Sequence, residues 1–484
     1  RREPFAFSAW YGAADCLARD QIVLRDPKSP SGWRFRSGYH SSLSRYRHAF
    51  ALRPAVLNAL RADAFADVRQ LLWTSGLDMR RGSSVGPDPQ MFAAFPSWEE
   101  DTLAFIPFPL SIITSSEPST LRRLPKTVDA AVQHERRLFR DIATGWVASD
   151  PRNAAAAHAL AISLFLLGEP SAIDTLARAK ALAVDRIDRQ RIVTTEIWMR
   201  VQFAVPSDLG SLRIARALAD SLLAAQPATP VDPATLSSIA ALTGRAYEAM
   251  RLDHSDPPGV LSPSASRLSG LSRSFTLFAS FGGPADSLKA LESRTDSLVD
   301  ALAPTGQRQA LRVESLGRAI CLAYPDVPLE AVRSFTASDW YLLRADAAAA
   351  RGDTAEVLRI LDGQRAMRQA FRLPELALDA LYPEASLLAS TGNARQGAEW
   401  LDPTLSKLDL SSYLADPVSA AMLVRAMAFR AELAARMGDT QTASRWSAAV
   451  VVLWSGSDEF LRPLVMRMRQ LSESEKPTGR SGTH

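Results

Sequence analysis

The sequence has 484 residues, of which 47% are hydrophobic and 22% are charged, and its formal net charge is +4. This composition is typical of globular proteins and excludes a largely disordered chain. No run of about 18 apolar residues occurs, so we expect no membrane-spanning helix. The only cysteines are Cys16 and Cys321, which excludes a disulfide framework and a cysteine-rich metal site.

The first quarter of the chain combines one predicted hairpin with irregular segments. The chain starts at Arg1 with no charged and then apolar leader, which predicts a processed or excised chain. Residues 1–56 are interpreted as a helical hairpin with a long inserted loop, at 20–38, that is rich in Pro, Ser and Gly. Residues 57–120 include many prolines and aromatics, which predicts an irregular segment packed on helices.

The rest of the chain reads as helical repeats. Ala, Leu and Arg dominate, and apolar residues recur at three- and four-residue spacing, so 121–252 and 285–471 are predicted to be helical arrays. The Pro, Gly and Ser residues of 253–284 predict a hinge between the arrays. Residues 459–471 are predicted to form a capping helix over the last apolar face, and 472–484 a flexible tail.

Three similar turns punctuate the second array. In each turn, one glycine followed by Asp or Asn lies between two helix-length apolar patterns. The turns and the helices they divide are Gly352 (339–351 and 355–367), Gly392 (375–390 and 395–406) and Gly438 (the two halves of 417–454). Glycine accepts the left-handed conformation that often ends a helix, and Asp can cap the next helix. These glycines, 40 and 46 residues apart, predict stacked helical hairpins.

Small and large side chains follow a characteristic spacing within several hairpins. The matching positions are Trp10, Ala13, Ala14, Leu17, Ser42, Tyr46, Ala49 and Pro54; then Leu160, Ala161, Leu164, Gly168, Ala172, Leu176 and Ala179; and finally Leu381, Ala385, Leu388, Gly392, Gly397 and Leu401. This pattern resembles the tetratricopeptide repeat (TPR) in a diverged form. The resemblance implies an all-α superhelical solenoid of TPR-like hairpins, with a concave surface that binds extended peptides or partner domains.

The C-terminal end shows a second resemblance. An Ala-rich hairpin is followed at 451–458 by Val-Val-Leu-Trp-Ser-Gly-Ser-Asp. This sequence is similar to the C-terminal repeat regions attached to bacterial serine/threonine kinases and transcriptional activators. That similarity implies an effector domain upstream of Arg1.

The sequence lacks several motifs that are typical of catalytic and cofactor sites. There is no Gly-Lys pair for a phosphate-binding loop, no Gly-x-Gly-x-x-Gly and no kinase signature. His134-Glu135 lacks the second histidine that a helical zinc site needs. The adjacent acids of 99–101 are typical of a solvated turn. We therefore expect no catalytic residue, no metal and no cofactor.

One segment could bind a partner or ligand. Residues 30–40 mix cations, aromatics and small residues inside the overlong loop, and the candidate binding residues are Trp33, Arg34, Arg36, Tyr39 and His40. Arg34 and Arg36 could clamp a carboxylate or phosphate, and the aromatic rings could stack on a partner group. In the alternative, the aromatics pack on the array and the arginines are solvated.

These patterns favour a non-enzymatic protein–protein interaction or scaffold module, whose partner is a protein or an extended peptide. The alternative is a ligand-sensing regulatory region that binds a small anionic molecule and signals to a domain missing from this chain. Nucleic acid is not expected as a partner, because the net charge is a small excess over a long chain. Compartment and oligomeric state stay open.

Overall fold

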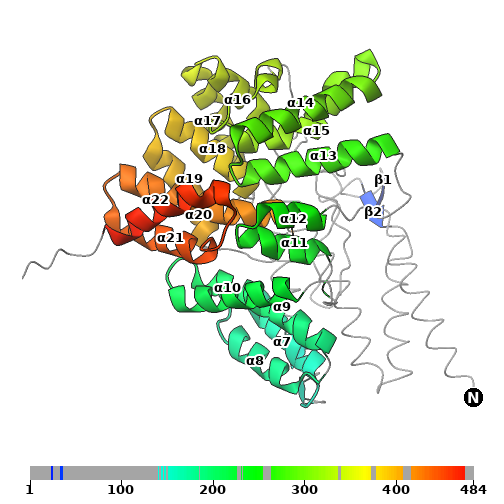
Figure 1. Cartoon of the computed structure of the whole chain (residues 1–484), viewed down its shortest axis with the longest axis vertical. Helices are drawn as coiled ribbons and strands as arrows, with labels where there is room; N and C mark the ends of the chain where they lie inside the picture. The colour runs from blue at the N-terminus through cyan, green and yellow to red at the C-terminus, as the bar shows by residue number, and fades with distance from the viewer. Residues whose placement is uncertain are drawn as a thin grey trace, which may run out of the picture. The chain divides into compact units, whose positions relative to one another are not determined.

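The computed structural model of the chain is almost entirely helical where it is described (Figure 1). The described residues are 23–25, 33–35, 140, 143–144, 147–148, 151–184, 186–225, 231, 233–253, 263–335, 340–371, 378–406 and 416–474. They contain sixteen α-helices and one pair of three-residue strands, so the all-α prediction is confirmed for this part of the chain. None of these helices has both the length and the apolar character that crossing a bilayer requires.

The chain divides into two compact units, and the first contains β1 (Val23–Arg25), β2 (Trp33–Phe35), α7 (Ala154–Leu166) and α8 (Ala172–Leu182). The two strands pair in antiparallel fashion, with Leu24 opposite Arg34. The sequence predicts a loop at 20–38, whereas the structure has the short β1–β2 strand pair inside it. The other parts of the predicted segments 1–56 and 57–120 lie outside the described residues.

Helices α7 and α8 form a hairpin. The Asn153 side chain caps α7 by accepting a hydrogen bond from the backbone N–H of Ala156 at 3.1 Å. Ala161 on α7 is fully buried, as are Ala172 and Ala179 on α8. These are three of the small positions in the TPR-like spacing, and small buried residues allow two helices to pack closely.

The second unit comprises Asp185–Ala366 and Glu375–His484. Its elements in chain order are α9 (Arg186–Ala204), α10 (Leu209–Ala224), α11 (Pro233–Leu242), α12 (Ala246–Asp253), α13 (Pro263–Ser280), α14 (Ala285–Leu302), η2 (Thr305–Gln307), α15 (Arg308–Ala323), η3 (Glu330–Ser334), α16 (Tyr341–Ala350), α17 (Thr354–Phe371), α18 (Leu378–Ser390), α19 (Ala394–Ser406), α20 (Pro417–Arg436), α21 (Thr440–Leu453), η4 (Glu459–Leu461) and α22 (Arg462–Glu473). Consecutive helices mostly pack as antiparallel neighbours (Figure 1).

The same turn closes six hairpins of the chain. In each turn a glycine with positive φ donates its N–H to the carbonyl three residues earlier, and the next residue donates to the carbonyl five residues earlier. The glycines are Gly168, Gly244, Gly282, Gly352, Gly392 and Gly438. This is the Schellman motif, which satisfies carbonyl groups that a helix end leaves without partners. The predicted turns at the last three glycines are confirmed, and they separate α16 from α17, α18 from α19, and α20 from α21.

The predicted cap after Gly438 is confirmed, and the aspartate after Gly352 caps its helix in the same way. The Asp353 carboxylate accepts from the Glu356 N–H at 3.1 Å, and the Asp439 carboxylate accepts from the Thr442 N–H at 3.0 Å. Asn393 differs, because its side-chain amide donates to the Thr391 hydroxyl at 3.2 Å instead.

Close helix packing explains one small residue of the TPR-like pattern. A methyl group added to Gly397 on α19 would lie 2.8 Å from the carbonyl oxygen of Ala385 on α18. No real side chain tolerates that distance, so glycine is required where these two helices meet. The larger positions Leu381, Leu388 and Leu401 are buried around this contact.

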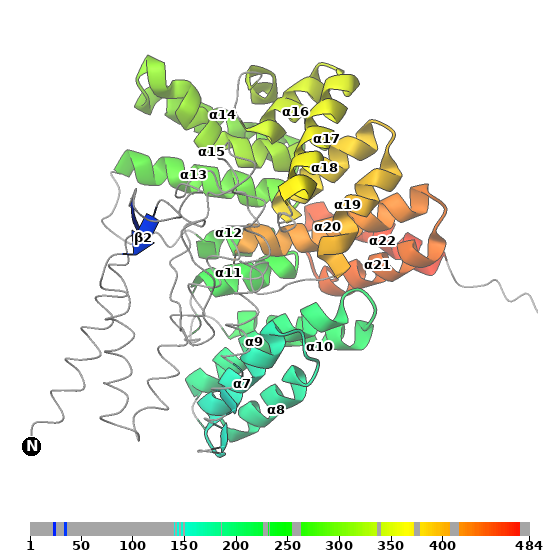
Figure 2. The same cartoon turned by 180° about the vertical axis from the view of Figure 1, so that it is seen from behind.

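Helix α20 crosses the centre of the second unit (Figure 2). It packs against α11, α13, α18, α19, α21 and α22. Seventeen of its twenty residues are buried, including Arg425 and Arg430. In an open solenoid each repeat contacts its neighbours alone, whereas α20 contacts helices that lie far earlier in the sequence.

The predicted hinge at 253–284 is wrong for its second half. Residues Pro263–Ser280 form α13, an 18-residue helix whose last third is buried. Proline is tolerated in the first turn of a helix, because the missing N–H has no intrahelical partner there. Residues 254–262 lie outside the described part of the chain.

The predicted capping helix at the C-terminus is present with shifted bounds. It consists of η4 and α22, and α22 continues to Glu473, two residues into the predicted tail. Val465 and Met468 of α22 are buried. The tail beyond residue 474 lies outside the described residues.

We expect Gly352→Ala to destabilise the second unit by about 1–2 kcal/mol. Gly352 has φ +76°, and a methyl group there would meet nothing within 4 Å, so backbone strain alone accounts for the loss. Urea unfolding followed by circular dichroism measures it. Gly363→Ala, in the interior of α17 with equally open surroundings, is the matched control. This variant should gain about 0.5–1 kcal/mol, and an equal effect of both changes would contradict the left-handed turn.

Candidate functional site

The structure places only part of the segment predicted to bind a partner. Trp33 and Arg34 belong to β2, and their backbone is extended and paired with β1. Arg36, Tyr39 and His40 lie outside the described residues. The binding role of this segment stays a prediction.

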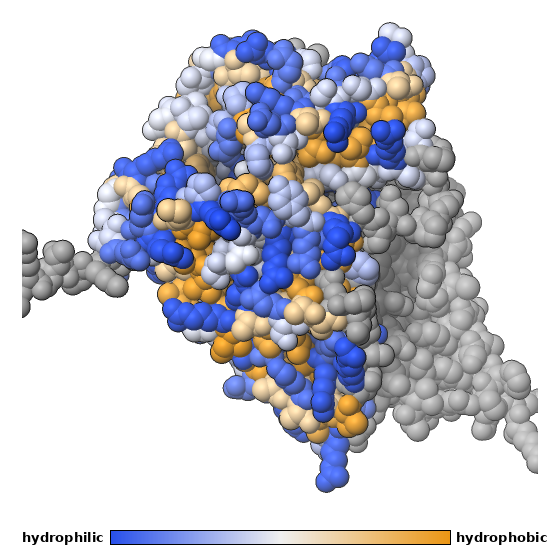
Figure 3. Space-filling model, in the orientation of Figure 1, coloured by the Kyte–Doolittle hydropathy of each residue, from blue (hydrophilic) through white to orange (hydrophobic). Residues whose placement is uncertain are grey.

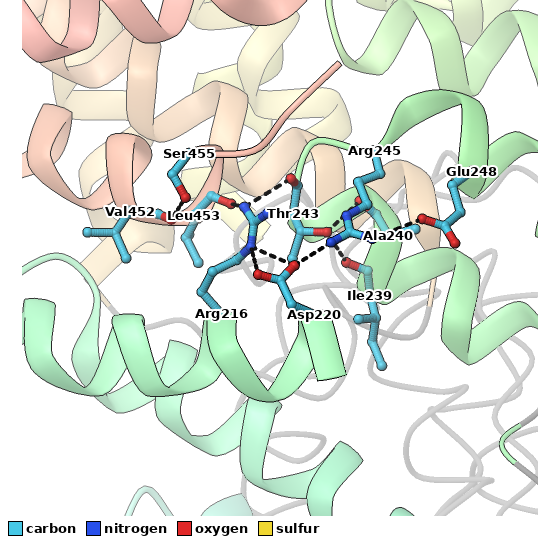
Figure 4. A network of polar contacts seen from close by, with 10 residues as sticks. All are labelled: Arg216, Asp220, Ile239, Ala240, Thr243, Arg245, Glu248, Val452, Leu453 and Ser455. Atoms are coloured by element: carbon cyan, nitrogen blue, oxygen red, sulfur yellow. Dashed lines mark hydrogen bonds and ion pairs between the residues drawn. The ribbon is translucent and has the colours of Figure 1, made fainter. Parts of the chain in front are cut away.

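A polar network joins three parts of the second unit (Figure 4). The Arg216 side chain on α10 is buried, and its Nε donates to both carboxylate oxygens of Asp220, at 3.1 and 3.0 Å. Its Nη1 donates to the carbonyl oxygen of Thr243 at 3.3 Å and to that of Leu453. These carbonyls lie at the C-terminal ends of α11 and α21, where the helix dipole favours a cation.

The network continues from Asp220 to the surface. Arg245, directly after the Gly244 turn, donates from Nη2 to Asp220 at 2.5 Å and pairs through Nη1 with Glu248 at 3.3 Å. Positive and negative groups therefore alternate along the chain of contacts from α10 to α12 (Figure 4). Both arginines make several geometrically defined hydrogen bonds, which fixes the α11–α12 turn against α10.

The segment 454–458 is fastened to the same turn. The Asp458 N–H donates to the carbonyl oxygen of Gly244 at 3.0 Å, and the Asp458 carboxylate accepts from the Tyr247 N–H at 3.0 Å. A methyl group on Gly456 would lie 2.8 Å from Nη2 of Arg216. Trp454 is fully buried, with its ring 5.9 Å from that of Phe281. The Trp-Ser-Gly-Ser-Asp segment at 454–458 therefore has a packing role.

The contacts of residues 454–458 with this turn bring together an aromatic surface. It is formed by Tyr247, Phe278 and Phe460, and we call it the Tyr247 surface. The Tyr247 ring centroid lies 5.5 Å from that of Phe278 and 5.9 Å from that of Phe460. Phe278 is buried and Phe460 is half-buried, whereas Tyr247 is 55% exposed. Three elements, α12, α13 and η4, contribute one ring each, so the cluster depends on the folded unit.

A second buried arginine has the same chemistry on α20. Arg425 donates from Nη1 to the carbonyl oxygens of Ala279, near the end of α13, and Leu322, near the end of α15, the latter at 2.8 Å. Its Nη2 pairs with Asp326, and its guanidinium lies 4.5 Å from the centroid of the Tyr382 ring. Burial lowers the pKa of Arg425 to about 9, so the side chain is still protonated at pH 7.

These clusters hold helices together, and nothing in their geometry points to a reaction. Within the described ranges, no group of three or more His, Cys, Asp and Glu residues is placed to hold a metal ion. The sequence gives no sign of the roles of Arg216 and Arg425, because an arginine in an Ala- and Leu-rich helix looks like a solvated residue. Residues Trp454–Asp458 enter the sequence analysis through a resemblance alone, and their contacts have no signal in the sequence.

Comparisons with known proteins give no family for this chain. No protein-family model matches the sequence, and no curated protein matches it. The residues themselves therefore carry the argument about function.

We expect Arg216→Met to destabilise the second unit by about 2–4 kcal/mol, because the carbonyl groups of Thr243 and Leu453 lose this buried donor while Asp220 keeps its contact with Arg245. Thermal and urea unfolding measure this loss. Arg213→Met, at an exposed position on the same helix, is the matched control and should change stability by less than about 0.5 kcal/mol. Equal effects of the two substitutions would show that the network adds no stability.

Proposed function

We propose that this chain is a non-catalytic protein-interaction module built from diverged TPR-like helical hairpins. The recurrent Schellman turn and the close approach of α18 and α19 at Gly397 support the repeat assignment. The concave surface of an open array is not the favoured binding site in the second unit. There α20 packs on α11, α13 and α18, helices that an open array would keep apart from it.

The Tyr247 surface is the observation that carries this proposal. Among the described residues of the second unit, the large apolar side chains that are exposed are mostly aliphatic ones, such as Ile214, Leu302 and Met466. On the face in Figure 3, hydrophobic residues form several separate patches among hydrophilic ones. Tyr247 differs from these residues, because its exposed ring rests on two further aromatic rings.

The fixed position of Tyr247 suits recognition of a protein partner. Tyrosine is enriched among the residues that dominate binding energy, and it has few rotatable bonds to immobilise. The Asp458 carboxylate fixes the backbone N–H of Tyr247, and the ring packs against Phe278 and Phe460, so less of its motion is lost when a partner binds. The partner is therefore a protein or peptide with an apolar group that can cover the ring.

We expect Tyr247→Ala to reduce the capture of the physiological partner at least about tenfold. Tagged chain is incubated with lysate of the source organism, and bound proteins are quantified by mass spectrometry. Met466→Ala, at a residue 60% exposed on α22, is the control and should leave capture within about twofold. A third arm, Arg34→Glu with Arg36→Glu, tests the segment that the sequence singles out.

The outcomes separate the two surfaces from each other and from the absence of a partner. Loss of the same protein in the Tyr247 arm alone supports the Tyr247 surface, and loss in the Arg34/Arg36 arm alone assigns binding to the 30–40 segment. An identical set of proteins in all arms, with no enrichment over the tag, overturns the interaction proposal. Circular dichroism of each variant confirms that the comparison is made between folded proteins.

A further inference from the structure

Asp346 on α16 is a carboxylic acid in an apolar interior. Its exposed fraction is 0%, and neither of its oxygens has a hydrogen bond of normal geometry. Glu384 on α18 is equally buried, but its carboxyl accepts a hydrogen bond from the Tyr341 hydroxyl at 2.6 Å. Buried polar groups are nearly always paired, so the isolation of Asp346 calls for a physical explanation.

The nearest ionisable neighbours of Asp346 come from α15 and the residue that follows it. The Cys321 thiol, 1% exposed, interacts with the Asp346 carboxyl as a weak donor, and Tyr324 lies within electrostatic range. The negative form of Asp346 opposes ionisation of both groups, which contributes to the raised pKa of the thiol beside the main effect of burial. A thiol is a poor donor and leaves a carboxylate largely unsatisfied.

The other elements around α16 supply no compensating cation. Glu330 and Arg333 on η3 are exposed, Glu384 on α18 accepts from Tyr341, and Glu356 on α17 pairs with Arg359 at 2.5 Å. Among the described residues no arginine or lysine stabilises a charge on Asp346. The folded unit therefore accommodates this side chain in its neutral form.

Burial raises the pKa of Asp346 well above its ordinary value of 3.8. In an opened state the carboxyl meets water and ionises near that ordinary value. Between the two pKa values the closed state binds one more proton than the open state. Stability is thus full at low pH and falls as pH rises through this window.

We propose that Asp346 is a proton-controlled latch at the contact of α15 and α16: the neutral side chain is compatible with the closed contact, whereas loss of its proton to solvent opens the contact and uncovers Cys321. The device goes beyond the proposed binding function, because it does not involve the Tyr247 surface. It makes local opening of the second unit dependent on pH.

The test uses Cys321 as the reporter. In the intact chain carrying Cys16→Ser, Cys321 is the remaining thiol, and its reaction with 4,4′-dithiodipyridine is followed from pH 5 to 7. Each rate is divided by that of the same chain unfolded in urea at the same pH, which removes the titration of the thiol itself. We expect this ratio to rise by up to about tenfold per pH unit.

Asp346→Asn should flatten this slope and slow the reaction at pH 7, since an amide cannot ionise. Asp362→Asn, at an exposed position on α17, is the matched control and should keep the full slope. Equal slopes in the parent chain and the Asp346→Asn chain, or no slope in the parent chain, would overturn the latch.

Hydrogen exchange keeps the test decisive if the Asp346→Asn chain does not fold. Peptides from α15 and α16 of the parent chain should open more at pH 7 than at pH 5, after correction for intrinsic exchange. Peptides from α7 and α8 in the first unit serve as the internal reference and should not change. A uniform response across all four helices would refute a local latch.

Discussion

Buried guanidinium groups that pair with helix C-terminal carbonyls are the interaction on which the second unit depends. Arg216 reaches the ends of α11 and α21, and Arg425 reaches the ends of α13 and α15. Each arginine also pairs with one aspartate, Asp220 or Asp326. A cation is favourable at a helix C-terminus, and its planar set of donors can satisfy several acceptors together.

This chemistry decides how hairpins that are distant in sequence meet. Schellman turns build each hairpin locally, but they do not specify which hairpins come together. Arg216 bridges residues more than two hundred positions apart, and Arg425 connects α20 to two helices from the middle of the chain. The rigid Tyr247 surface is a by-product of that closure, because Phe460 and Asp458 reach α12 only when the C-terminal elements return to it.

Local features of the fold were predictable from the sequence, and distant ones were not. Gly352, Gly392 and Gly438 predict the turns in which they lie, since few other residues accept a left-handed backbone at a helix end. The central position of α20 has no such signal, because Arg425 and Arg430 read as solvent-facing residues when their partners are unknown. Pro263 and the serines after it suggest a hinge, whereas tertiary packing makes them helix α13.

The candidate sites divide in the same way. Asp346 sits within an Ala-rich helix whose other members predict burial, but a lone acid in such a pattern does not reveal whether a counter-charge faces it. Tyr247 is one tyrosine on a short helix, and its neighbours come from residues 278 and 460. Contacts between residues so far apart in sequence depend on three-dimensional packing. The periodicity of apolar residues along the chain therefore does not predict them.

The central position of α20 also affects co-translational folding of the chain. Residues Leu236–Leu242 of α11 are all buried in the finished unit, partly beneath a helix that begins at Pro417. Until that helix has been synthesised, an apolar strip of the nascent chain has no permanent cover. The interval is set by translation of the intervening residues, so a chain arrested before Pro417 would be a natural substrate for chaperones that hold exposed apolar segments.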